Sequence, residues 1–167
     1  MEPYQPQSGW TLVASATLLQ MVCEEIQLSS PAHAVTAVVE LGASDVPEMI
    51  GLTTLTKPGP FNQHTHELGS YLGVRRECKL VAMAGERLKV PGFTEVSAVC
   101  THPEHTGRGY AGLLMIEVMQ RIRGQEETPF LHVREDNTRA IELYKRLGFV
   151  TRAQVQLAVL RKTPVGD

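Results

Sequence analysis

The stretch from Val96 to Ala111, VSAVCTHPEHTGRGYA, constrains what this chain can fold into more than any other part of it. It begins as a β-branched run, passes through two glycines, Gly107 and Gly109, and continues into an apolar stripe with helical spacing. This order predicts a strand, a tight turn and a helix. Thr106 is expected to cap the helix, and the bare amides behind it are suited to bind a pyrophosphate. The glycines could also serve the turn alone.

Hydrophobic periodicity predicts the strands and helices in the rest of the chain. Alternating and β-branched runs predict strands at residues 35–41, 70–75, 79–89, 93–101 and 130–133, with a final strand pair at 149–153 and 155–160. Helices are expected at 44–53, 63–68, 109–124 and 140–147. Ser44 is expected to cap the first of them. Only short turns separate the three strands between residues 70 and 101, which predicts an antiparallel meander.

The first 33 residues differ from the rest of the chain. Composition shifts at Ser29, Ser30 and Pro31, so we expect an N-terminal extension over residues 1–33 and the main domain over residues 34–167. Residues 10–15 alternate as a strand does, whereas the apolar run at 18–22 fits a helix or a strand. The extension is expected to be an appendage to the main domain.

Charge and cysteine content exclude several classes of function. Sixteen Lys and Arg against eighteen Asp and Glu give a charge of −2, without the basic excess of a nucleic-acid or anionic-membrane binder. No apolar run reaches the ~20 residues of a membrane-spanning helix. The three cysteines match neither a disulfide framework nor a metal knuckle, and His64 and His66 lack a third ligand. We expect a cytoplasmic protein with small partners, no nucleic acid, no membrane and no metal.

A second stretch, LHVREDNTRAIELYKRLGF from Leu131 to Phe149, pairs with the first. Together they resemble the Gcn5-related N-acetyltransferase (GNAT) superfamily. In that family the turn reads Gln or Arg, two residues, Gly, one residue, then Gly or Ala, and the run Thr106 to Ala111 departs from it only at its first position. The family's later helix carries an Asn, an Ala and a Tyr before Gly-Phe, matched here by Asn137, Ala140, Tyr144, Gly148 and Phe149.

The resemblance covers residues 35–160, and within the superfamily the chain is similar to the FR47-like branch. It implies an α/β GNAT fold, a mixed and mostly antiparallel sheet that is splayed at the cofactor strand and has helices on both faces. It also implies an N-acetyltransferase that moves an acetyl group from acetyl-CoA to a primary amine by direct transfer in a ternary complex. The N-terminal extension then looks like the tail of a preceding half that longer relatives carry.

The resemblance also assigns a cofactor site. One strand edge, Val99 to Thr101, would pair with the two pantetheine amides of acetyl-CoA, and the Val99 amide would stabilise the oxyanion. The residues implied to bind the cofactor are Val99, Cys100, Thr101, Thr106, Gly107, Arg108, Gly109, Tyr110, Ala111, Asn137 and Tyr144.

Two side chains are implied to carry the chemistry. Glu95 stands fourteen residues before Gly109, the spacing of the catalytic glutamate in histone-acetyltransferase members, and is the candidate base that takes a proton from the amine. It could instead be a solvated residue on a strand edge, with a water chain as the base. Tyr144 is the candidate proton donor to the departing thiolate, or else a half-buried core aromatic.

The acceptor is expected to be a small primary amine such as an amino acid or its derivative, with protein N-termini second and histone-like lysines last. The stiff loop at residues 57–61 can wall a small pocket but offers few donors to an extended peptide. Acidic groups such as Glu67 and Glu95 would hold the amine. Two alternatives remain, a catalytically weak module that binds acyl-CoA and a protein N-terminal acetyltransferase. A homodimer also stays open.

Overall fold

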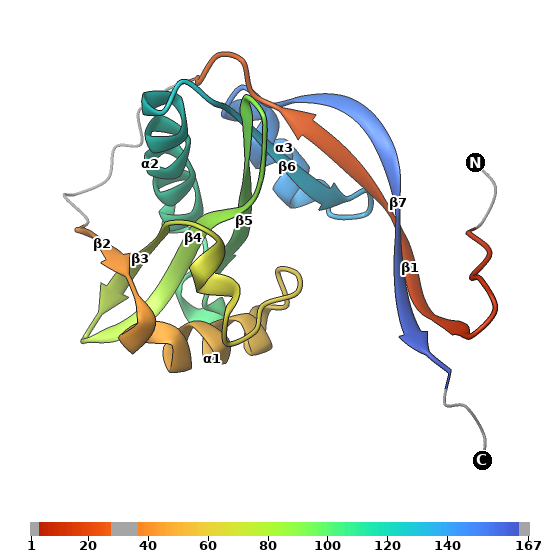
Figure 1. Ribbon diagram of the computed structural model, residues 1–167. Coiled ribbons are helices and arrows are strands. Elements are labelled where there is room, and N and C mark those ends of the chain that lie inside the picture. The colour runs from red at the N-terminus through yellow and green to blue at the C-terminus, as the bar shows by residue number, and fades with distance from the viewer. Residues whose placement is uncertain (1–3, 28–36, 164–167) are drawn as a thin grey trace.

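The computed structural model describes residues 4–27 and 37–163, which form a seven-stranded sheet with helices on both faces (Figure 1). Neighbouring strands follow the order β2-β3-β4-β5-β6-β1-β7. The strands are β1 Trp10–Val22, β2 Val38–Leu41, β3 Tyr71–Arg76, β4 Lys79–Val90, β5 Phe93–Thr101, β6 Thr128–Arg134 and β7 Val150–Lys162. The helices are α1 Val46–Thr56, α2 Tyr110–Gly124 and α3 Thr138–Arg146, with 3₁₀ turns η1 Ala43–Asp45, η2 Thr65–Leu68 and η3 Pro103–His105.

The sheet is mostly antiparallel, and the parallel pairing of β5 with β6 is short. It extends from Phe93 opposite Thr128 to Glu95 opposite Phe130. Near the middle of β5, Ala98 has a φ of +53°, and the register between β4 and β5 shifts around it. A bulge of this kind bends its strand. β5 and β6 therefore separate beyond Glu95, and the predicted splay of the sheet is confirmed.

Two apolar clusters place the helices on opposite faces of the sheet. The smaller cluster joins α1 to one face and includes Met49 and Met83. The larger cluster joins α2 and α3 to the other face and includes Leu131 and Ile141. The apolar stripe predicted for α2 is confirmed, because Leu114, Met115, Val118 and Ile122 are all buried.

The C-terminal part differs from the predicted pair of strands. β7 runs without interruption, and its partner is β1. Gln154, the polar residue between the two expected strands, pairs with Leu19 in the ladder and is exposed. A single polar side chain between two apolar runs therefore lies on an open strand face here and does not mark a turn.

The N-terminal strand is the second difference. β1 is a strand over its whole length and lies between β6 and β7, pairing with β6 through Leu18–Val22 and with β7 through Trp10–Val22. Met21 joins the larger core cluster. β1 is therefore an internal strand of the sheet and not an appendage. The division of the chain at residue 33 stays a prediction, because residues 28–36 lie outside the described residues.

The distal parts of β1 and β7, residues 10–17 and 156–162, pair with each other and curve away from the body of the molecule as a two-stranded arm (Figure 1). Within residues 4–27 and 37–163, no helix is long and apolar enough to cross a membrane.

The predicted cap of α1 is wrong. Ser44 lies inside η1, and Asp45 is the residue that precedes the helix. The Asp45 carboxylate accepts a hydrogen bond from the Gly42 amide at 2.9 Å and pairs with Arg75 at 2.6 Å. An ionised carboxylate with two charge-assisted partners fixes this turn better than a serine hydroxyl would.

Candidate active site

A groove of about 510 Å³ opens where β5 separates from β6, on the face covered by α2 and α3. Strand β5, the turn before α2, the first residues of α2 and the length of α3 form its walls. The predicted cofactor residues that line it are Val99, Thr101, Thr106, Gly107, Arg108, Gly109, Tyr110, Ala111, Asn137 and Tyr144. Residues from two distant stretches of the sequence thus meet in one cavity, and their contacts with a cofactor stay a prediction.

The turn before α2 exposes its backbone to the groove. Gly107 and Gly109 both have a φ of +77°, a conformation that glycine adopts without strain. A Cβ built on Gly107 would meet no atom within 4 Å, so the space beside it is open. Gly109 is the residue that precedes the helix, and the first amides of α2 have no acceptor within the helix. These amides form an N-terminus that attracts an anion.

Thr106 does not cap α2, so that prediction is wrong. Its Oγ1 donates to the Pro103 carbonyl at 3.0 Å and closes the 3₁₀ turn η3. Thr106 lies three residues before Gly109, the residue that precedes the helix, and no described side chain caps α2. The cradle therefore depends on backbone amides and on the glycine conformations rather than on a threonine cap.

Two polar atoms of the groove residues lack a hydrogen-bond partner in the described part of the chain. Thr101 Oγ1 and His105 Nδ1 are buried, and neither has a hydrogen bond. Both residues line the groove, together with the cations Arg108, Arg139 and Arg146. Buried polar atoms are normally hydrogen-bonded in folded proteins. A groove with unpaired polar atoms and three guanidinium groups fits a ligand that carries amides and phosphates, as acetyl-CoA does.

Asn137 and Tyr144 come from the second motif. Asn137 precedes α3 and caps it, since its side-chain oxygen accepts a hydrogen bond from the Ala140 amide at 3.3 Å. The Tyr144 ring is buried against Phe149, with ring centroids 6.0 Å apart. Burial raises the pKa of Tyr144 to about 12. The phenol in the groove wall is therefore protonated at neutral pH and able to donate.

Two of the predicted residues direct their side chains elsewhere. Tyr110 Oη accepts a hydrogen bond from Arg76 Nε at 2.8 Å, so this phenol faces β3 and only the backbone of Tyr110 belongs to the cradle. Cys100 does not line the groove, because its side chain joins the core cluster on the α1 face. Burial raises the pKa of the Cys100 thiol to about 11, which keeps it protonated and a poor nucleophile.

Glu95 lies at the last paired position of β5 and β6, where the strands begin to separate. It is 1% exposed, and Arg87 donates to both of its carboxylate oxygens, through Nε and Nη2, at 2.9 Å. His132 Nδ1 lies 2.8 Å from Glu95 Oε1. Burial raises the pKa of Glu95, but the hydrogen bonds from His132 and Arg87 and the Arg87 charge outweigh it and lower the pKa overall. Glu95 is thus an ionised, fully engaged carboxylate.

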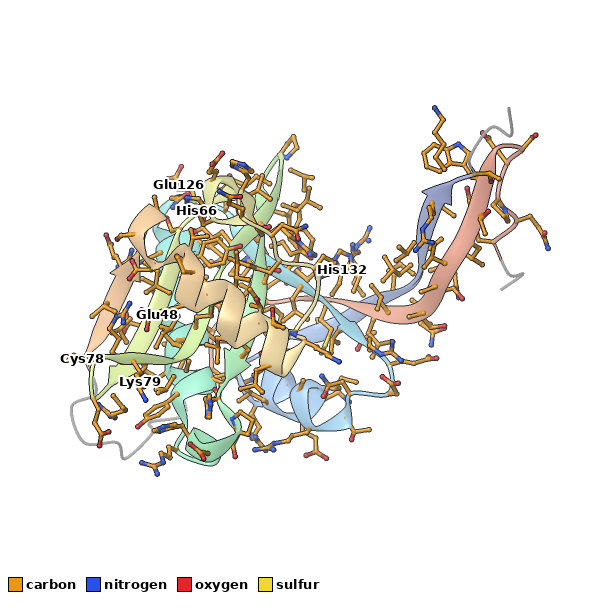
Figure 2. The ribbon with its side chains drawn as sticks, turned by 90° about the horizontal axis from the view of Figure 1, so that it is seen from below. Glu48, His66, Cys78, Lys79, Glu126 and His132 are labelled. Carbon is orange, nitrogen blue, oxygen red and sulfur yellow. The ribbon has the colours of Figure 1, made fainter. Side chains whose placement is uncertain are left out.

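His132 is a candidate that the sequence analysis missed. It lies on β6 between Leu131 and Val133, which both face the larger core cluster, so its side chain faces the other side of the sheet. Figure 2 shows His132 near the place where the arm joins the body. The sequence did carry a signal for it: in Leu131-His132-Val133 a polar residue alternates with two apolar ones, as it does in a strand whose two faces differ.

The hydrogen bonds around His132 assign its tautomer. Arg152 Nη1 donates to Gln20 Oε1 at 2.6 Å, which directs Gln20 Nε2 toward His132 Nε2 at 3.2 Å. His132 Nε2 must then accept, so the proton lies on Nδ1 and is donated to Glu95. The Nε2 lone pair therefore accepts from Gln20, at the edge of a second cavity of about 380 Å³ that His132, Gln20 and Arg152 help to line.

Comparisons with known proteins agree with this architecture. Residues 71–157 match the family described as FR47-like protein. A solved structure of a GNAT-family protein from Novosphingobium aromaticivorans is 40% identical and has a TM-score of 0.88, with 98% of this chain and 72% of that chain covered. The ribosomal-protein-S18-alanine N-acetyltransferase of Escherichia coli shares the fold at 18% identity and a TM-score of 0.63, with 80% of this chain and 97% of that chain covered.

One curated relative is the N-alpha-acetyltransferase RimI of Mycobacterium tuberculosis, which is 36% identical over 100 residues. The match covers 55% of this chain and 60% of RimI, so the chain spans less than two thirds of that relative's length.

The splayed sheet, the glycine turn and these matches together define a class. The chain belongs to the GNAT family, and the relatives named above are described as acetyltransferases. Within that family it belongs to the FR47-like family. The resemblance drawn from the two sequence motifs is confirmed.

Proposed function

We propose that this protein transfers an acetyl group from acetyl-CoA directly to an amine, with both substrates bound at once. The observation that carries the proposal is the groove beside β5, where the glycine turn before α2 and the unpaired edge of β5 line one cavity. The groove with the glycine turn opens on one face of the sheet, and the cavity beside His132 opens on the other. In this proposal the amine binds beside His132 and approaches the thioester where β5 and β6 separate.

The groove residues would hold acetyl-CoA. The amides of the turn before α2 would bind the pyrophosphate, with Arg108, Arg139 and Arg146 as supporting charges. The unpaired edge of β5 at Val99 and Thr101 would pair with the pantetheine amides. The Val99 amide would stabilise the oxyanion, and a donor of this kind is worth ~3 kcal/mol. Tyr144, which burial keeps protonated, would donate its proton to the departing thiolate.

His132 is our candidate for the base, and Glu95 is our candidate for the group that positions it. With its proton on Nδ1, His132 can take a proton at Nε2 once the amine replaces the Gln20 N–H there, whereas Glu95 has both oxygens engaged and a lowered pKa. The amine nitrogen forms a bond to the acetyl carbonyl carbon, and the C–S bond breaks. Of the two protons that the ammonium group loses, one leaves through His132. The other restores Tyr144 after its donation to the thiolate.

An experiment on the whole chain tests this function. Purified protein is incubated with acetyl-CoA and a panel of amines, with CoA release and the acetylated product both measured. Direct transfer predicts intersecting initial-rate lines for the two substrates and no acetylated protein after incubation with acetyl-CoA alone. A stable acetyl adduct on the protein would contradict direct transfer. Binding of acetyl-CoA without turnover of any amine would instead support the acyl-CoA-binding module.

A second acceptor class is favoured by one observation, the match to an N-alpha-acetyltransferase at 36% identity. Under this alternative the amine is the N-terminus of a protein. The two acceptor classes share the groove, the base and the proton donor, and they differ only in what surrounds the amine.

A further inference from the structure

The second cavity combines an apolar wall with a short row of polar groups. Leu88, Val90, Phe93 and Phe130 supply the wall, and Gln20, His132 and Arg152 supply the polar row. Leu88, Val90 and Phe93 are each at least 40% exposed, so apolar side chains remain open to a ligand here. A small molecule with one apolar group would bury it against this wall.

Gln20 connects the two ends of the polar row. Its carboxamide directs an N–H to His132 Nε2 and an oxygen to Arg152 Nη1, at 3.2 Å and 2.6 Å. In an α-amino acid the amino group and the carboxylate are bonded to the same carbon, so nitrogen and oxygen lie only slightly farther apart than they do in a carboxamide. Such a molecule can take the place of the Gln20 carboxamide, with an N–H for His132 and an oxygen for Arg152.

Arg152 has donors left for an anion. The structure gives it one hydrogen bond among the described residues, to Gln20, and a guanidinium group has five N–H donors. Its side chain is exposed at the edge of the cavity. The other cation nearby, Arg87, is held by both oxygens of Glu95. The free guanidinium edge of Arg152 is therefore the group that selects a carboxylate.

We propose that the second cavity binds the acceptor as an α-amino acid with an apolar side chain. Its amino group lies at His132, its carboxylate pairs with Arg152, and its side chain packs on Phe93 and Phe130. This inference rests on the proposed acetyl transfer and names its substrate class. A protein N-terminus carries a peptide carbonyl where the amino acid carries a carboxylate, so the Arg152 pairing separates the two acceptor classes.

Four amines that share the leucine side chain test the proposal: L-leucine, L-leucinamide, the tripeptide Leu-Gly-Gly and 3-methylbutylamine. Acetylation of each is measured with the full chain at saturating acetyl-CoA. We expect kcat/KM for leucine to exceed the values for the other three amines by about tenfold or more, because they lack a carboxylate next to the amine. The series is repeated with the phenylalanine analogues to cover a larger side chain.

Arg152→Gln is the variant and Arg161→Gln, on the arm of the same strand, is the matched control. Arg152→Gln should lower kcat/KM for leucine about tenfold and remove the preference over leucinamide, while Arg161→Gln keeps that preference. A parent enzyme that acetylates the amide or the tripeptide as well as leucine would overturn the proposal. So would an equal loss for all four amines in Arg152→Gln, since Arg152 would then act only by orienting Gln20.

The outcomes separate this inference from the proposed function. Turnover of any amine without a carboxylate preference leaves acetyl transfer standing and removes the amino acid site. Turnover of no amine contradicts acetyl transfer, and calorimetric titration of L-leucine into the protein with CoA then still measures the site. Binding that Arg152→Gln abolishes and Arg161→Gln keeps would support the site, and absence of binding to the parent would overturn it.

Discussion

The groove and the second cavity lie on the two sides of the same splayed strands, but they are built from different kinds of residues. The groove depends on two continuous stretches, 99–116 and 137–147, and much of its proposed chemistry comes from backbone amides at a glycine turn. The second cavity depends on side chains from β1, β4, β5, β6 and β7, and Gln20 and Arg152 are 132 residues apart in the chain. The proposed cofactor groove is thus local in sequence, whereas the proposed acceptor cavity depends on long-range strand pairing.

The largest effect on the rate of acetyl transfer is expected from replacing His132, the proposed base in the second cavity. His132→Ala is expected to lower the rate of acetyl transfer by about 10³, because general base catalysis contributes ~10²–10⁴. The affinity for acetyl-CoA should stay near that of the parent. Single-turnover rates and calorimetry with acetyl-CoA measure the two quantities. A parallel loss of both would show that the two sides of the splay are not independent.

The next effect concerns the cofactor side alone. Gly109→Val places a β-branched residue at a φ of +77° and a side chain at the anion cradle, so acetyl-CoA affinity should fall by ~10² or more. Gly124→Ala is the control, since a Cβ at that far end of α2 meets nothing within 4 Å. Thermal unfolding confirms that both variants fold. An unchanged dissociation constant in a folded Gly109→Val protein would remove the turn from the cofactor site.

Tyr144 tests whether the groove contributes chemistry as well as binding. Tyr144→Phe is expected to slow transfer by ~10² with acetyl-CoA affinity nearly kept, because the phenol acts on the leaving thiolate. The measurement is the single-turnover rate with bound acetyl-CoA. If that rate equals the rate of the parent, Tyr144 serves only as part of the core with Phe149.

A smaller effect distinguishes two roles for Glu95. If Glu95 positions His132, Glu95→Gln should lower kcat/KM by about tenfold, and the loss should be similar across the pH range. If Glu95 were itself the base, the loss would shrink as the pH approaches the pKa of the amine. The pH profile of kcat/KM for parent and variant decides between them, with thermal unfolding as a check because Arg87 loses its ion pair.

The smallest expected effect tests whether the Cys100 side chain belongs to the groove. The Cys100 side chain packs on the α1 face, so Cys100→Ser should change acetyl-CoA affinity by less than about twofold, although it places a hydroxyl in the core and lowers stability. Calorimetry together with thermal unfolding separates the two effects. A large loss of affinity with unchanged stability would mean that this side chain reaches the cofactor after all.

Much of the fold and one half of the site could be predicted from the sequence. The glycine turn from Gly107 to Gly109, the stripe of α2 and the Asn137 cap are determined by residues within a few positions of one another, and such local patterns are legible in a single chain. The misplaced Thr106 cap is a small error within a correct turn, because both the threonine and the glycines favour a turn at that place.

The tertiary structure decided the rest. Sequence periodicity predicts strands at β1 and β7, over residues 10–15, 149–153 and 155–160, but does not say that β1 inserts between β6 and β7, because strand partners are chosen by long-range packing. Only that insertion brings Gln20 beside His132 and Arg152, and only the end of the parallel pairing at Glu95 opens the sheet there. The amino-acid sequence by itself determined the glycine turn proposed to hold the cofactor, since its donors are neighbours in the chain. The cavity proposed for the acceptor was decided by the pairing of five strands, since its polar groups become neighbours only after folding.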